Sequence, residues 1–232
     1  MRRTIKTYYK ATRPGATSFY DGKTAWTVGE ITELPEPGRG TVLSKAGVLH
    51  ASTEPGESLV GGSWPCRLFE VEPVGELITE DRHPYKVGAH AWRVVREIEA
   101  WRALGPNGEA VVALIERAKN TTYDEVARLG AVRVAVQDTA AWYAARNAAQ
   151  YAAWYAARLA AQDTAWYAAQ VAPQDTAWYA AQDAARIAAW VAAQDAARVA
   201  AMALVVRDTI TTEQFDQLYG PWKSVMEAGP ST

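Results

Sequence analysis

Residues 142–201 read WYAARNAAQYAA-WYAARLAAQDTA-WYAAQVAPQDTA-WYAAQDAARIAA-WVAAQDAARVAA, five consecutive units of 12 residues that each begin with tryptophan. The five tryptophans are Trp142, Trp154, Trp166, Trp178 and Trp190. Short repeats build structures in which neighbouring units stack on one another or on a partner. We therefore expect a scaffolding role for this part of the chain, and we interpret the tryptophans as structural rather than ligand-binding residues.

The composition of the repeat favours helix, because 27 of its 60 residues are alanine, the strongest helix former. Since a helix turns roughly 100° per residue, successive tryptophans would lie roughly 120° apart around it. Such a helix has no constant apolar stripe, so it must be covered on several sides or fold back, and Pro173 supplies a break. We expect a helical bundle or long antiparallel helices over residues 137–207. A solenoid with one short coil per unit is the alternative.

The N-terminal part of the chain, residues 1–104, has the pattern of a small β-rich module. Short segments rich in β-branched and aromatic residues alternate with Gly/Pro clusters, which is typical of strands joined by turns. The expected strands lie in TIKTYYKAT (4–12), AWTVGEITEL (25–34), AGVLHAS (46–52), PCRLFEVE (65–72) and HAWRVVREIEAW (90–101).

Helical patterns follow this module. Residues 105–136 are predicted to form connecting helices, with Thr122 and Glu125 as a capping box. Residues 208–232 are predicted to form a short helix and a tail, with Thr211 or Thr212 as the N-cap and a stop at Gly220-Pro221. The predicted fold class is α+β, a β-rich module followed by an Ala-rich, all-α repeat region.

Composition excludes several classes of partner. The formal net charge is −2, and no segment gathers the Lys and Arg that a nucleic-acid interface needs, so we expect no nucleic-acid partner. No apolar run reaches the roughly 18 residues of a membrane-spanning helix, so we expect no membrane association. A single cysteine cannot form an internal disulfide, which favours a reducing cytoplasm.

Candidate catalytic residues are few and weak. His50 lies in GVLHAST between a glycine and small hydroxyl residues, and Glu70 and Glu72 form a Glu-x-Glu on a predicted strand. Two carboxylates on one face of a rigid strand can stabilise a cationic transition state. The three histidines lack the spacing of a metal site, so we expect no metal and no cofactor.

The Ser52-Thr53 pair upstream of Glu70 and Glu72 is loosely similar to arginine-modifying ADP-ribosyltransferases. That resemblance implies an enzyme of reduced size that acts through its Glu-x-Glu strand. The leading arginine strand of those enzymes has no clear counterpart here, and the hydroxyl motif is incomplete.

Five short motifs of the N-terminal module resemble an uncharacterised family of bacteriophage and prophage proteins. They are Gly22-Lys23-Thr24 with Val28-Gly29, Gly47-Val48-Leu49-His50-Ala51-Ser52, Arg67-Leu68-Phe69-Glu70-Val71, Gly75-Glu76-Leu77 and Arg96-Glu97-Ile98. Similar proteins of actinobacterial phages also carry Ala-rich tails with recurrent Trp, Arg and Asp, and ends like Ala203–Trp222. Ser44 stands where these relatives commonly have cysteine. The resemblance implies a phage protein in the cytoplasm of an infected bacterial host, and it supplies no catalytic residue.

Three functions remain open from the sequence. The first is a phage accessory protein that binds a host or phage protein without catalysis, with the repeat as a scaffold or oligomerisation arm that could also form a homo-oligomer. The second is the ADP-ribosyltransferase-like enzyme. The third is a structural component of the virion.

Overall fold

The computed structural model describes residues 7–36, 38–43, 45–131 and 180–227. The architecture is mixed α+β, with an antiparallel sheet and several helices. The chain divides into two compact units, with the boundary between Gly105 and Pro106. Most of the 12-residue repeat, residues 142–179, lies outside the described residues, and so do the ends of the chain.

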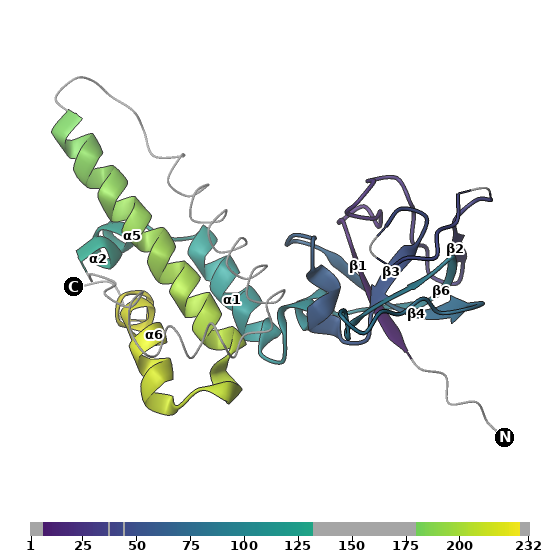
Figure 1. The fold of residues 1–232 in the computed structure, drawn as a ribbon. Coiled ribbons are helices and arrows are strands. Elements are labelled where there is room, and N and C mark those ends of the chain that lie inside the picture. The colour runs from purple at the N-terminus through teal and green to yellow at the C-terminus, as the bar shows by residue number, and fades with distance from the viewer. Residues whose placement is uncertain (1–6, 37, 44, 132–179, 228–232) are drawn as a thin grey trace. The chain divides into compact units, whose positions relative to one another are not determined.

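The N-terminal unit contains one six-stranded sheet with the order β2-β6-β4-β1-β3-β5, in which every neighbouring pair is antiparallel (Figure 1). The strands are β1 (Tyr8–Thr12), β2 (Ile31–Glu33), β3 (Leu49–Ser52), β4 (Arg67–Val74), β5 (Lys86–Ala89) and β6 (Ala91–Ile98). Two 3-10 turns, η1 (Pro55–Leu59) and η2 (Ala100–Leu104), complete the unit. Of these, η1 contacts β1 and β3, while η2 contacts β4.

The core of this unit is aromatic. Trp92 is fully buried, meets Tyr8 edge to face at 5.5 Å between ring centroids, and donates its indole N–H to the Leu49 carbonyl oxygen at 2.9 Å. Trp26 is buried beside them and donates its own indole N–H to the Ser18 hydroxyl at 2.8 Å. Buried indoles require such partners, because an unpaired N–H in an apolar core is costly.

One predicted strand is shorter in the structure, and one strand of the structure was not predicted. The predicted strand over residues 25–34 is reduced to β2, because Gly29 has a φ of +87° and the Glu30 N–H bonds to the Thr27 carbonyl in a turn. Strand β5 was not predicted. Its sequence KVGA is short and contains Gly88, and a strand without a run of β-branched residues gives little local signal.

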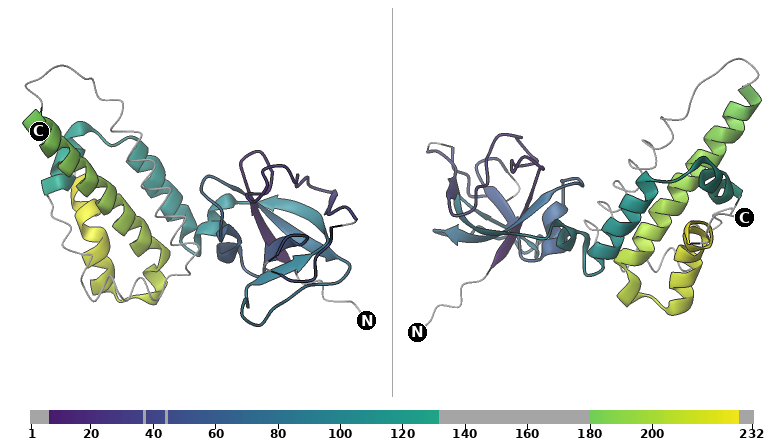
Figure 2. Two further views of the ribbon diagram at one scale, coloured as in Figure 1. Left: turned by 45° about the horizontal axis from the view of Figure 1, so that its top comes forward. Right: turned by 180° about the vertical axis from the view of Figure 1, so that it is seen from behind.

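The C-terminal unit contains α1 (Gly108–Lys119), α2 (Tyr123–Ala131), α5 (Ala180–Val205), the 3-10 turn η4 (Arg207–Thr209) and α6 (Thr212–Met226). Figure 2 shows α5 running beside α1 and α6, and α5 also contacts α2. No helix among the described residues combines the length and apolarity that a membrane crossing requires.

Both predicted helix starts are confirmed by capping boxes. The Thr122 N–H donates to the Glu125 carboxylate at 2.8 Å, and the Glu125 N–H donates to the Thr122 hydroxyl at 3.3 Å. Thr211 is the N-cap of α6, and its partner in the box is Gln214. Each pair satisfies two backbone donors that a helix start leaves without an intrahelical acceptor.

The predicted stop at Gly220-Pro221 is wrong, because α6 continues through Pro221 to Met226. A proline inside a helix removes one backbone hydrogen bond. Here the apolar face extends past it: Leu218, Trp222, Val225 and Met226 recur at helical spacing and are all buried. Burial of that face offsets the lost hydrogen bond.

Candidate functional site

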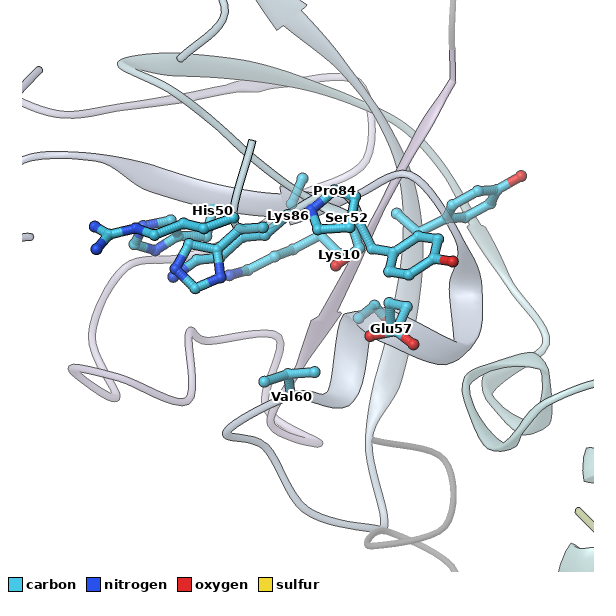
Figure 3. Close-up of a pocket in the computed structure, with 13 residues that line it drawn as sticks. Lys10, His50, Ser52, Glu57, Val60, Pro84 and Lys86 are labelled. Atoms are coloured by element: carbon cyan, nitrogen blue, oxygen red, sulfur yellow. The ribbon is translucent and has the colours of Figure 1, made fainter. Parts of the chain in front are cut away.

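A cavity of about 320 Å³ opens beside β1, β3 and β5 of the N-terminal unit. Turn η1 and the segment before β5 form its remaining walls. Figure 3 shows Lys10, His50, Ser52, Pro84 and Lys86 together, with Glu57 and Val60 below them. The full lining is Tyr9, Lys10, His50, Ala51, Ser52, Glu57, Ser58, Val60, Arg82, His83, Pro84, Tyr85 and Lys86.

Backbone pairing explains how distant segments meet at this cavity. In the sheet Tyr9 of β1 lies opposite Ser52 of β3, and Ser52 lies opposite Lys86 of β5. Since residues opposite each other in adjacent strands point to the same face, Tyr9, Ser52 and Lys86 form a row across the sheet. The η1 turn begins at Pro55, three residues after β3, and so brings Glu57 and Ser58 beside this row.

His50, the histidine singled out in the sequence, lines the cavity but is engaged by backbone. Its Nε2 forms a short hydrogen bond with the Leu43 carbonyl oxygen. Because a carbonyl oxygen only accepts, Nε2 must carry the proton, which leaves Nδ1 as the free ring nitrogen. Burial lowers the pKa of His50, and the nearby cations Lys86 and Lys10 lower it further. The ring is therefore neutral at pH 7.

Lys10 and Lys86 give the cavity its positive charge. Burial lowers the pKa of Lys10 to about 8, and the Lys86 ammonium adds to this, while the charge of Asp21 opposes it. Burial likewise lowers the pKa of Lys86, against the charge of Glu80. The Lys10 ammonium also lies 4.9 Å from the centre of the Trp26 ring. Within the described part of the chain, neither lysine forms an ion pair with a carboxylate.

The Glu57 carboxyl group faces this positive side of the cavity. Burial raises its pKa, and the nearby Glu54 raises it further. Arg82 also lines the cavity, but its guanidinium is held by the Glu80 carboxylate at 2.7 Å. Positive charge therefore exceeds negative charge among the lining residues, and the cavity is chemically suited to bind an anion.

We expect the burial cost of Lys10 to appear as a pH-dependent stability. Its pKa is about 8 in the folded protein and roughly 10.4 in the unfolded chain. Between these values the unfolded state binds more protons, so the free energy of unfolding rises with pH; below pH 8 the full cost of the buried charge is present. Lys10→Met should therefore be more stable than the native chain by about 1–3 kcal/mol at pH 7, and should lose most of this advantage near pH 10.

Urea unfolding at several pH values between 7 and 10 measures the effect. The control is Lys45→Met, since Lys45 is exposed and lies outside the cavity, and its difference from the native chain should stay constant. A difference for Lys10→Met that did not change with pH would contradict the expectation.

The Glu-x-Glu of β4 lies outside this cavity. Both oxygens of Glu70 accept hydrogen bonds from Arg96 of β6, at 2.7 Å each. Glu72 lies opposite Arg93, which also belongs to β6. A register shift between Glu70 and Val71 interrupts the ladder at this point. The structure therefore does not bring Glu70 or Glu72 together with His50, and Glu70 serves as a cross-strand ion-pair partner.

The structure also describes Thr53, the other two histidines and the single cysteine. The Thr53 N–H donates to the Tyr85 carbonyl oxygen at 2.9 Å, and His90 Nε2 bonds with the Gly40 carbonyl oxygen at 2.7 Å. His83 lines the cavity. Cys66 is buried, which raises the pKa of its thiol to about 12 and makes it a poor nucleophile.

Of the repeat tryptophans, Trp190 lies within α5, and Trp142, Trp154, Trp166 and Trp178 lie outside the described residues. No cluster of His, Cys, Asp and Glu suited to a metal ion occurs among the residues that the structure describes.

Sequence reasoning missed Lys10, Glu57 and Lys86. They lie far apart in the chain, and each alone has the appearance of an ordinary surface charge. No family model, curated protein or solved structure matches the chain.

Proposed function

We propose that this protein is a phage accessory protein that acts by binding another protein, of the host or of the phage, in the cytoplasm of an infected bacterium. The Ala-rich repeat serves as its scaffold or oligomerisation arm. The single observation that supports this most is the environment of α5, the helix that contains the last repeat unit.

Helix α5 is contacted by α1, α2 and α6. Its last residues, from Val199 to Val205, are all buried. A 12-residue repeat rotates its tryptophans roughly 120° from unit to unit, so such a helix requires cover on several sides. For α5, three helices of the same unit supply cover of this kind. The preceding units carry the same aromatic pattern, and we propose that a partner chain or a second copy covers them.

One observation weighs against the transferase alternative. That alternative uses Glu70 and Glu72 together, but the Glu70 carboxylate is held by Arg96 through two hydrogen bonds. The transferase alternative is therefore less supported than binding. A virion component remains a third candidate, and mass spectrometry of purified particles tests it directly.

Deleting residues 142–177 from the full chain tests the proposed role of the repeat. This removes three whole units and leaves the last two units of the repeat in place. Helices α1, α2, α5 and α6 all lie outside the deletion. We expect the deleted chain to lose self-association and partner capture while it keeps a cooperative unfolding transition.

Self-association is measured by sedimentation equilibrium, and partner capture by crosslinking in infected actinobacterial cells followed by mass spectrometry. The matched control is the full chain with Val191→Ala, which alters an exposed side chain of α5 and leaves the earlier units intact. A deleted chain that keeps the same oligomeric state and the same crosslinked partner would overturn the proposal.

A further inference from the structure

The cavity beside β1, β3 and β5 carries more positive than negative charge, since Lys10, Lys86 and Arg82 line it with a single carboxylate, Glu57. Lys10 and Lys86 both face it without an ion-pair partner among the described residues, and Arg82 is held by Glu80. The Lys86 ammonium lies near enough to lower the pKa of Lys10. Two ammonium groups that repel each other in a partly buried cavity favour an anion between them.

We propose that this cavity binds a small phosphorylated sugar, alone or as part of a mononucleotide, with the phosphate held by Lys10 and Lys86 and a sugar hydroxyl held by Glu57. This goes beyond the proposed role in protein binding, and it concerns the N-terminal unit alone.

Charge and acceptor number favour phosphate over carboxylate. A phosphate monoester carries a charge of about −1.5 to −2 at pH 7 and has three acceptor oxygens, so it can bind both lysines at once even with the Glu57 carboxylate in the lining. The Ser52 hydroxyl lines the same cavity and has no hydrogen-bond partner among the described residues. It lies opposite Lys86 in the sheet, so it can donate to the same anion.

The volume of the cavity and the residues across from the lysines indicate what the rest of the ligand is. A volume of about 320 Å³ lies at the lower end of the range for small-molecule sites, and it exceeds what one phosphate ion needs. Glu57 faces the cavity across from the lysines (Figure 3). A carboxylate accepts hydrogen bonds from hydroxyl groups, and the apolar surfaces of Val60 and Tyr85 can pack on a sugar or a base.

Isothermal titration calorimetry of the full-length protein at low salt tests the proposal with four probes: ribose 5-phosphate, adenosine monophosphate, inorganic phosphate and ribose. We expect ribose 5-phosphate to bind, ribose to show no binding, and inorganic phosphate to bind more weakly than the sugar phosphate. If the mononucleotide binds more tightly than ribose 5-phosphate, the base also contacts the cavity. If it binds equally or more weakly, the sugar phosphate is the ligand class.

Matched variants locate the binding. Lys86→Gln should weaken ribose 5-phosphate at least tenfold, because a hydrogen bond to a charged group is lost, and Lys45→Gln, at an exposed lysine outside the cavity, should leave it unchanged. Glu57→Gln should reduce the preference for the sugar phosphate over inorganic phosphate, because it removes the acceptor of the sugar hydroxyl without weakening the binding of the inorganic ion. Thermal unfolding of each variant confirms that it is folded, and Ser52→Ala replaces Lys86→Gln if that chain does not fold.

Three results would overturn the proposal: no binding of ribose 5-phosphate, equal binding to native protein and the Lys86→Gln variant, or inorganic phosphate as tight as the sugar phosphate. The last would indicate a general anion site. These titrations use purified protein without a partner, so their failure is separate from a failure of partner capture by the repeat.

Discussion

Replacing Trp92 with alanine is expected to destabilise the N-terminal unit by about 3–5 kcal/mol. The side chain is fully buried, and it contacts Tyr8 edge to face. Its removal leaves a large cavity at the centre of the core and deprives the Leu49 carbonyl oxygen of its indole donor. Since small domains are stable by only about 5–15 kcal/mol, the variant should populate the unfolded unit at moderate urea concentrations.

Urea unfolding followed by NMR signals of the sheet amides measures this loss for the N-terminal unit. Trp92→Phe keeps most of the ring volume and should fall between the native chain and the alanine variant. Val95→Ala on the same strand removes an exposed side chain and should change stability by less than about 0.5 kcal/mol. A loss below about 1 kcal/mol for Trp92→Ala would show that this ring does not organise the core.

Gly47→Ala is the second large expected effect. Gly47 has a φ of +88°, and a Cβ placed there would lie 2.3 Å from the Gly38 carbonyl oxygen and 2.4 Å from the Gly40 nitrogen. Neither atom belongs to a flexible side chain, so the backbone of this loop must move. The Gly40 N–H also donates to the Gly47 carbonyl at 2.8 Å, and this bond would be strained. We expect a loss of about 3 kcal/mol or more.

The matched control is Gly29→Ala. Gly29 has almost the same φ, +87°, but a Cβ there meets nothing within 4 Å. Gly29→Ala should therefore lose only about 1 kcal/mol of stability, the cost of placing alanine in the left-handed conformation. Urea unfolding of both variants therefore separates backbone strain from steric contact. Equal losses at the two positions would rule out the close approach at Gly47.

Gly47→Ala should also affect the cavity, through His50. His50 bonds to the Leu43 carbonyl, which lies in the loop that Gly40 and Gly47 close. Displacing that loop would release the His50 ring. NMR titration of the imidazole follows this change, with the pKa of His50 rising toward its ordinary value as the ring becomes solvated.

Much of the fold could be predicted from local sequence. Periodicity and turn residues indicated five of the six strands and the helices α1, α2 and α6, and the capping residues Thr122 and Thr211 marked two helix starts. Strand β5 gave too short a pattern. The predicted end of α6 was wrong because Pro221 was interpreted from its local sequence alone. The helix continues because residues such as Trp222 and Val225 are buried by tertiary packing.

Of the residues used in the candidate site, the sequence indicated only His50 and Ser52. Lys10, Glu57 and Lys86 come together because β1 pairs with β3, β3 pairs with β5, and η1 follows β3 closely. No local pattern encodes those pairings. The Glu-x-Glu of β4 gave a stronger sequence signal than any of these residues, and its first member is occupied by a cross-strand arginine.

The position of β1 has a consequence for how the binding cavity can arise. This first strand lies in the interior of the sheet, between β4 and β3, and β4 begins 55 residues after β1 ends, from Thr12 to Arg67. During synthesis β1 is made before both of its neighbours, and its pairing with β4 must follow the synthesis of β3. Losing it would divide the sheet into β2-β6-β4 and β3-β5 and separate the two halves. Lys10 would then be missing from the cavity, so ligand binding there would report that the first strand made has joined β3 and β5.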